Sequence, residues 1–117
     1  MPAQQFIRDG DLSAALAALQ DAARKDAANP KHRIFLFQLL AVLGQWGRAL
    51  TQLNVAGELD AATLPMVQTY REAIQCEALR AEIFAGRRAP LVFGEPPSWL
   101  AQLLQALALD ASDPQGA

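Results

Sequence analysis

Few residues of this chain have the type and surroundings that catalysis needs. His32, the single histidine, stands between Lys31 and Arg33 at a predicted helix start. A catalytic relay needs a hydroxyl nucleophile and an orienting carboxylate beside the imidazole, and neither stands nearby, so we interpret His32 as a solvated polar residue. Cys76, the single cysteine, falls in the middle of a predicted helix. A reactive thiolate needs a helix N-terminus or a cationic neighbour, so we predict an inert, partly buried thiol.

The carboxylates give no better candidate for acid–base chemistry. Glu72, Glu77 and Glu82 recur every five residues on one predicted helix, which spreads them around it and prevents a carboxylate dyad. Glu77 and Arg80 have the spacing of a surface ion pair. The sequence has no glycine-rich phosphate loop and no metal-ligand spacing. It therefore predicts a protein without enzymatic activity, metal or cofactor.

Composition and charge narrow the class of protein. Of the 117 residues 52% are hydrophobic, and Ala and Leu, which favour helix, dominate them. The net charge of −2, with interspersed signs, argues against nucleic acid as a partner. A single cysteine suits a reducing compartment. The N-terminus lacks the features of a signal peptide. The longest apolar run, 34–43, is too short to span a membrane. We predict one domain in the cytoplasm.

An internal repeat is the clearest organising feature. Gly10 and Gly44 stand 34 residues apart, and similar residues follow each. The matched pairs are Leu12 with Trp46, Ala15 with Ala49, Leu16 with Leu50, and Leu19 with Leu53. A period of 34 is that of the tetratricopeptide helix–turn–helix repeat. Such repeats stack to bury a shared core and leave a groove, which favours a protein that holds other proteins.

The helices that must form this stack can be placed from the spacing of apolar residues and from the glycines and prolines that end a helix. We predict helices from about residue 3 to 8, from 12 until the pattern fades at 24–26, and over 31–43, 46–59, 65–85 and 98–109, with a loop over 86–97. The helix over 31–43 is apolar all round, so we expect it to be buried on every side. The fold class is all-α: about five to six helices as tetratricopeptide-like hairpins in a right-handed stack over residues 1–110, followed by a tail or linker at 111–117.

The repeat pattern also has a defect. The middle of the first helix of a tetratricopeptide repeat takes a small residue, but this chain has Phe37 there. No third turn glycine appears, since Ala78 stands where it would fall. We therefore predict about one and a half recognisable units. Phe37→Ala should behave as a large-to-small change in the core.

Two surfaces are candidates for binding. The first is the groove that the first helix of each pair would line, and it takes in Lys31, Ile34, Phe35, Gln38, Arg71 and Gln75. It would suit an amphipathic helix or an extended peptide, although Ile34 and Phe35 could equally be ordinary core residues. The second is the loop over 86–97. Arg87 and Arg88 come directly after a helix C-terminus there, where the helix dipole favours positive charge. Its apolar run, Leu91, Val92 and Phe93, either folds back over the bundle or is an exposed edge offered to a partner.

Several motifs resemble the ImpE/TagJ family of bacterial type VI secretion accessory proteins. They are the stretches 35–40, 43–46 and 48–50, then 70–74, 76–77, 84–87 and 94–96, followed by Trp99. The resemblance covers roughly residues 6–109. It implies a cytoplasmic adaptor without catalytic residues, which binds the N-terminal helix of the sheath small subunit and links the contracted sheath to its AAA+ disassembly ATPase.

The same resemblance implies a second, C-terminal domain beyond the linker at 111–117. An alternative function is therefore a helical scaffold, whose exposed surface serves self-association or docking of that domain. The apolar last helix and the run from Leu91 to Phe93 motivate it. A thiol enzyme using Cys76 is the third and weakest hypothesis.

Overall fold

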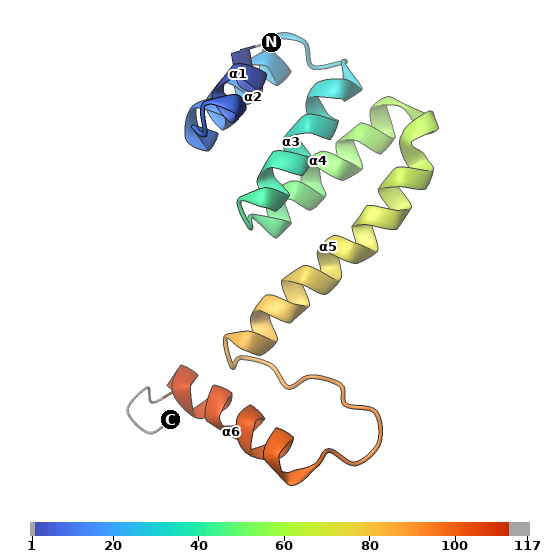
Figure 1. Ribbon diagram of the computed structural model, residues 1–117. Helices are drawn as coiled ribbons and strands as arrows, with labels where there is room; N and C mark the ends of the chain where they lie inside the picture. The colour runs from blue at the N-terminus through green and yellow to red at the C-terminus, as the bar shows by residue number, and fades with distance from the viewer. Residues whose placement is uncertain (1, 113–117) are drawn as a thin grey trace. The chain divides into compact units, whose positions relative to one another are not determined.

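Figure 1 shows the chain as a computed structural model, which describes residues 2–112. These residues form six α-helices and one short 3₁₀ turn, with no strand among them. The helices are α1 (Pro2–Arg8), α2 (Leu12–Lys25), α3 (Pro30–Val42), α4 (Trp46–Leu59), α5 (Leu64–Phe84) and α6 (Ser98–Ser112), and the 3₁₀ turn η1 spans Ala61–Thr63. The all-α prediction is confirmed. The chain divides into two compact units, one up to Gln75 and one from Cys76.

The turns of the two hairpins form where the repeat predicted them. Gly10 and Gly44 adopt φ of 77° and 75°, the left-handed region that glycine reaches without a steric penalty. After the first turn, the carboxylate of Asp11 accepts a hydrogen bond of 3.0 Å from the backbone N–H of Ala14. This is the predicted N-cap of α2, and it satisfies one of the backbone donors left unpaired at the helix start.

The first unit has two clusters of buried side chains, and α3 contributes to both. Leu36 and Leu39 of α3 belong to the cluster that joins α1, α2 and α3. Phe37 and Leu40 belong to the cluster that α3 shares with α4 and α5. The repeat-related Ala15 and Ala49 are completely buried, so at both positions a small side chain allows neighbouring helices to pack closely.

The prediction that α3 is buried on every side is wrong at its C-terminal end. Val42 is 73% exposed and Gln38 is also exposed. Helices α2 and α4 flank α3, and the residues they cover are buried. The stripe that contains Gln38 and Val42 faces neither, so an apolar side chain on α3 stays open to solvent there.

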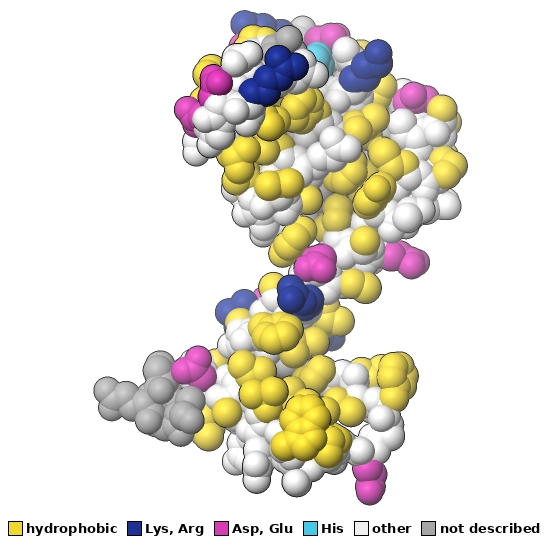
Figure 2. Space-filling model, in the orientation of Figure 1, with side chains coloured by type: hydrophobic (Ala, Val, Ile, Leu, Met, Phe, Trp, Pro, Cys, Tyr) yellow, Lys and Arg dark blue, Asp and Glu magenta, His cyan; other side chains and the backbone are white. Residues whose placement is uncertain are grey.

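The second unit comprises the end of α5, the loop 85–97 and α6. Gly86 ends α5 with φ of 77°, and a Cβ at this position would collide with the backbone carbonyl of Leu107 in α6. Glycine is therefore required both for the left-handed turn and for the close approach of α6. No residue from 76 to 112 is fully buried, so this unit has no closed core of its own. Figure 2 shows apolar side chains gathered on its visible face.

Candidate functional site

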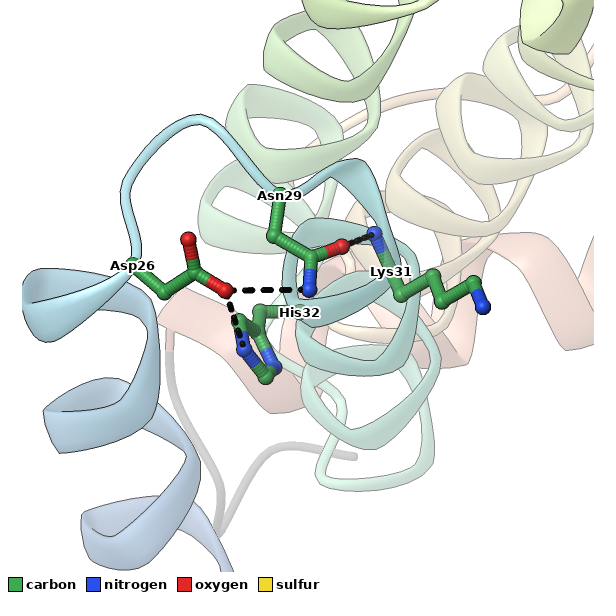
Figure 3. A network of polar contacts seen from close by, with 4 residues as sticks. All are labelled: Asp26, Asn29, Lys31 and His32. Carbon is green, nitrogen blue, oxygen red and sulfur yellow. Dashed lines mark hydrogen bonds and ion pairs between the residues drawn. The ribbon is translucent and has the colours of Figure 1, made fainter.

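The single histidine takes part in a structural network and not in a catalytic relay. Its Nε2 lies 3.5 Å from Oδ2 of Asp26, and the side chain is only 18% exposed (Figure 3). Asn29 donates to the same carboxylate oxygen over 3.1 Å and accepts from the backbone N–H of Lys31 over 3.0 Å. The network ties the turn after α2 to the start of α3. His32 is therefore less solvated than we predicted, and a carboxylate that the sequence spacing did not suggest lies beside it.

The other candidates for chemistry are surface groups. Cys76 is exposed, which corrects the prediction of a partly buried thiol. Glu77 and Arg80 form the predicted ion pair, with 3.7 Å between charged atoms. Across residues 2–112, no group of three or more His, Cys, Asp or Glu side chains is arranged to hold a metal ion. In the same stretch, no helix combines the length and apolarity needed to cross a membrane.

The six residues predicted to line one groove lie in different places. Phe35 and Gln38 line a cleft on the α1 side of α3. Ile34 packs against the other cluster, which α3 shares with α4 and α5, so the neighbouring residues Ile34 and Phe35 contact different clusters. Lys31 is exposed near the start of α3, and Gln75 is exposed on α5. Their role in binding stays a prediction.

Arg71 faces α4 and not the cleft of α3. Its Nε and one terminal nitrogen donate to Oδ1 of Asn54 over 3.2 and 3.0 Å, and the two residues line a shallow hollow between α4 and α5. The neighbouring Tyr70 covers Phe37 of α3, with 5.6 Å between ring centroids. Tyr70 of α5 thus reaches toward α3, where Val67 and Ile74 of the same helix pack in the cluster that contains Phe37.

The cleft beside α3, here called the α1–α3 cleft, is lined by Ile7, Leu12, Phe35, Gln38, Leu39 and Val42. It encloses about 240 Å³, and all lining side chains except Gln38 are apolar. Ile7 is 38% exposed and Val42 73% exposed. Sequence reasoning missed both, since Ile7 stood beside a helix end and Val42 was expected to be buried. The sequence did hold one signal for them. Both are apolar residues near the C-terminal end of the first helix of a repeat unit, Ile7 in α1 and Val42 in α3.

The loop after α5 exposes its apolar residues. Leu91 is 84% and Phe93 93% exposed, while Val92 is half-buried. Of the two alternatives, folding back over the bundle is therefore wrong for Leu91 and Phe93. Arg88 is exposed beside them, and a role of this loop in partner binding stays a prediction.

Arg87 forms an ion pair with Glu82, in addition to its place next to the C-terminal end of α5. Its Nε and a terminal nitrogen donate to the two carboxylate oxygens of Glu82 over 2.8 and 2.9 Å. These hydrogen bonds hold the pKa of the Glu82 carboxyl below its ordinary value and raise the pKa of Arg87. A two-pronged pair of this kind fixes the orientation of the guanidinium as well as its charge.

Comparison with known proteins agrees with this architecture. Residues 6–74 match the family model described as tetratricopeptide repeat. Over 111 residues the chain is 60% identical to the type VI secretion system accessory component TagJ of Pseudomonas aeruginosa, a match that covers 95% of this chain and 40% of the relative. The chain thus spans about two fifths of the length of that curated relative. The resemblance to the ImpE/TagJ family is confirmed, and with a repeat model over more than half of its length the chain belongs to the tetratricopeptide repeat family.

Proposed function

We propose that this chain is a non-enzymatic adaptor of bacterial type VI secretion that holds an amphipathic helix of a partner in the α1–α3 cleft. The observation that carries the proposal is the apolar lining of this cleft in a tetratricopeptide repeat, with Ile7 and Val42 exposed to solvent. The likeness to a relative named as a type VI accessory component supplies the cellular setting. Binding through a repeat surface needs no catalytic group.

The form of the cleft favours a helix over a small molecule. Its volume of about 240 Å³ is below the range of roughly 300–1,000 Å³ typical of small-molecule sites. Phe35, Gln38 and Val42 follow one stripe of α3 at spacings of three and four residues, and a partner helix presents its own apolar anchors at the same spacings. Lys31 lies one turn further along this stripe and is exposed, where it can meet an acidic residue at the rim.

The finer assignment of partners rests on the resemblance to the ImpE/TagJ family. The occupant we propose is the N-terminal helix of the sheath small subunit, and the second partner is the AAA+ ATPase that disassembles the contracted sheath. The adaptor would bring the two together in the cytoplasm. With the ATPase added to a preformed complex of chain and helix peptide, co-elution of all three would support this bridging role, and displacement of the peptide would count against it.

The first test is calorimetric titration of the chain with a peptide copying that helix, taken from the same gene cluster. We expect saturable one-to-one binding. Gln38→Trp fills the cleft with a bulky side chain and should weaken binding by at least about tenfold, equivalent to about 1.4 kcal/mol. The matched control is Gln68→Trp, which changes another exposed glutamine, on α5, outside the cleft lining and outside the predicted binding residues.

The control decides how the result is interpreted. Equal affinities for wild type and Gln68→Trp, with a loss for Gln38→Trp, would support the cleft. Equal affinities for all three proteins would move the binding site away from α3. Absence of binding to the wild-type chain would count against the sheath helix as the partner.

A further inference from the structure

The second unit contains an apolar groove that the proposed function does not use. It lies between the end of α5 and α6, and we call it the α5–α6 groove. Its walls include Leu79, Ile83 and Phe84 of α5 and Leu100, Leu103 and Leu107 of α6. It encloses about 380 Å³, and Arg80 is the single charged residue that lines it. The guanidinium of Arg80 lies over the Phe84 ring, 5.1 Å from its centroid, so even this charge rests on an apolar surface.

Three aromatic side chains of this unit together expose an apolar area as large as the largest patch of a typical monomer. Phe84 is 62%, Phe93 93% and Trp99 65% exposed. With roughly 150–250 Å² for a whole aromatic side chain, these fractions amount to roughly 330–550 Å² from three residues alone. The largest apolar patch on a typical monomer is about 300–600 Å² in total and is often functional. Leu91 and Leu103 add further exposed area to the same unit.

The unit also lacks the means to be stable by itself. No residue from 76 to 112 is fully buried, and α6 carries one charged residue, Asp110, in its 15 positions. A stretch this short, below about 40 residues, rarely folds without a disulfide, a metal or a partner surface. Cys76 is the only cysteine of the chain, so an internal disulfide is excluded. The described residues also contain no cluster that could hold a metal ion, which leaves a partner surface as the source of stability.

The size of the relative indicates what that surface is. The 111 matched residues are 40% of the relative, so more residues lie outside the match than within it, enough for a domain of ordinary size. Helix α6 extends to Ser112, so residues 111 and 112 of the predicted linker are helical, and the rest of it, 113–117, lies outside the described residues. A domain of the same chain has a high effective concentration at the groove, about millimolar where the connection is short, and a separate partner would have to compete with it.

We propose that the α5–α6 groove is the docking site for a further domain of the longer protein, the counterpart of the part of the relative that this chain does not match. The domain would cover Phe84 and Leu103 with an uncharged apolar face. This inference deepens the alternative scaffold function and involves no residue of the α1–α3 cleft. Failure of one proposal is therefore distinguishable from failure of the other.

Cys76 supplies a direct probe, because it is exposed and lines the groove. The experiment compares the rate at which a maleimide modifies Cys76 in the 117-residue chain and in the same chain extended by the unmatched part of the relative. A covered thiol reacts only when the interface opens. We therefore expect modification to slow by at least about tenfold in the extended chain.

Two variants make the comparison specific. Phe84→Glu places a charge in the groove wall and should restore fast modification in the extended chain. Leu59→Glu introduces the same charge at an exposed apolar position of the first unit that lines neither the groove nor the α1–α3 cleft, and the slow rate should persist. If the extended chain does not fold cooperatively, the same rates are measured on the full-length relative with a cysteine at the position aligned with Cys76.

Three results would overturn the proposal. Equal rates in the short and extended chains would show that the groove stays open. A slow rate that Phe84→Glu does not relieve would place the cover elsewhere. A rate that falls with rising concentration of the 117-residue chain, together with a doubled mass in light scattering, would make a second copy the occupant.

Discussion

Phe37 stands where tetratricopeptide repeats take a small residue, and here it is a core residue. It is 4% exposed and belongs to the cluster that includes Leu40, Leu53 and Val67. Its ring also contacts Tyr70, so α5 packs on α3 through an aromatic pair. The exception to the repeat pattern thus creates a contact that holds the start of α5 against the hairpin α3–α4.

Removal of this ring tests that contact. Phe37→Ala should lower the free energy of unfolding by about 3–5 kcal/mol, the usual cost of a large cavity in a core, out of a total of about 5–15 kcal/mol for a domain. Tyr70→Phe, which keeps the ring and removes only the hydroxyl, is the control. Chemical denaturation measures both, and a Phe37→Ala variant with an unchanged midpoint would contradict the core assignment.

The ion pair of Glu82 and Arg87 offers a second test at the scale of single residues. Hydrogen bonds from Arg87 lower the pKa of Glu82 in the folded state. A lowered pKa means that the stabilising effect of the pair is present above the unfolded-state pKa and is lost as pH falls through the folded-state pKa. Arg87→Gln should therefore raise the pKa of Glu82 toward its ordinary value, measured by carboxyl carbon NMR. The exposed Glu72 on the same helix is the internal control, and an unchanged Glu82 titration would refute the pairing.

At the scale of elements, helix boundaries followed from local chemistry and could be predicted. Glycines at 10, 44 and 86 adopt the left-handed conformation that ends a helix, and Asp11 caps the next one. Such signals act within a few residues and are therefore legible in a sequence. The bounds of α4 agree with the predicted ones, and α3 differs by one residue at each end.

The faces of the helices were predicted less well, because burial depends on a neighbour from elsewhere in the chain. Val42 and Phe93 are apolar and exposed, which neither periodicity nor composition can distinguish from core. Ile34 and Phe35, adjacent in sequence, pack toward different clusters. The predicted groove joined them because sequence spacing cannot tell which side of a helix receives which neighbour. The candidate site is therefore only partly the one that the sequence indicated.

At the scale of the whole molecule, buried apolar surface is distributed unevenly along the chain. Both core clusters consist of residues between Ala3 and Ile74. The side chains of α6 remain at least partly exposed. Burial of apolar area is the main favourable term in folding, so stability should follow this division. The α1–α3 cleft then rests on the stable part, while the α5–α6 groove belongs to the part that needs a cover.

Native-state hydrogen exchange of the 117-residue chain tests this division. Amides of α3 lie between two buried clusters and should open only with global unfolding, whereas those of α6 should exchange through local openings of much lower free energy. Mild denaturant distinguishes the two, because exchange of α3 amides should accelerate steeply with denaturant and exchange of α6 amides should barely respond. Amides of α4 serve as the reference for global unfolding. Protection of α6 equal to that of α4 would show that the second unit is stable by itself, and would remove the reason for its groove to require a cover.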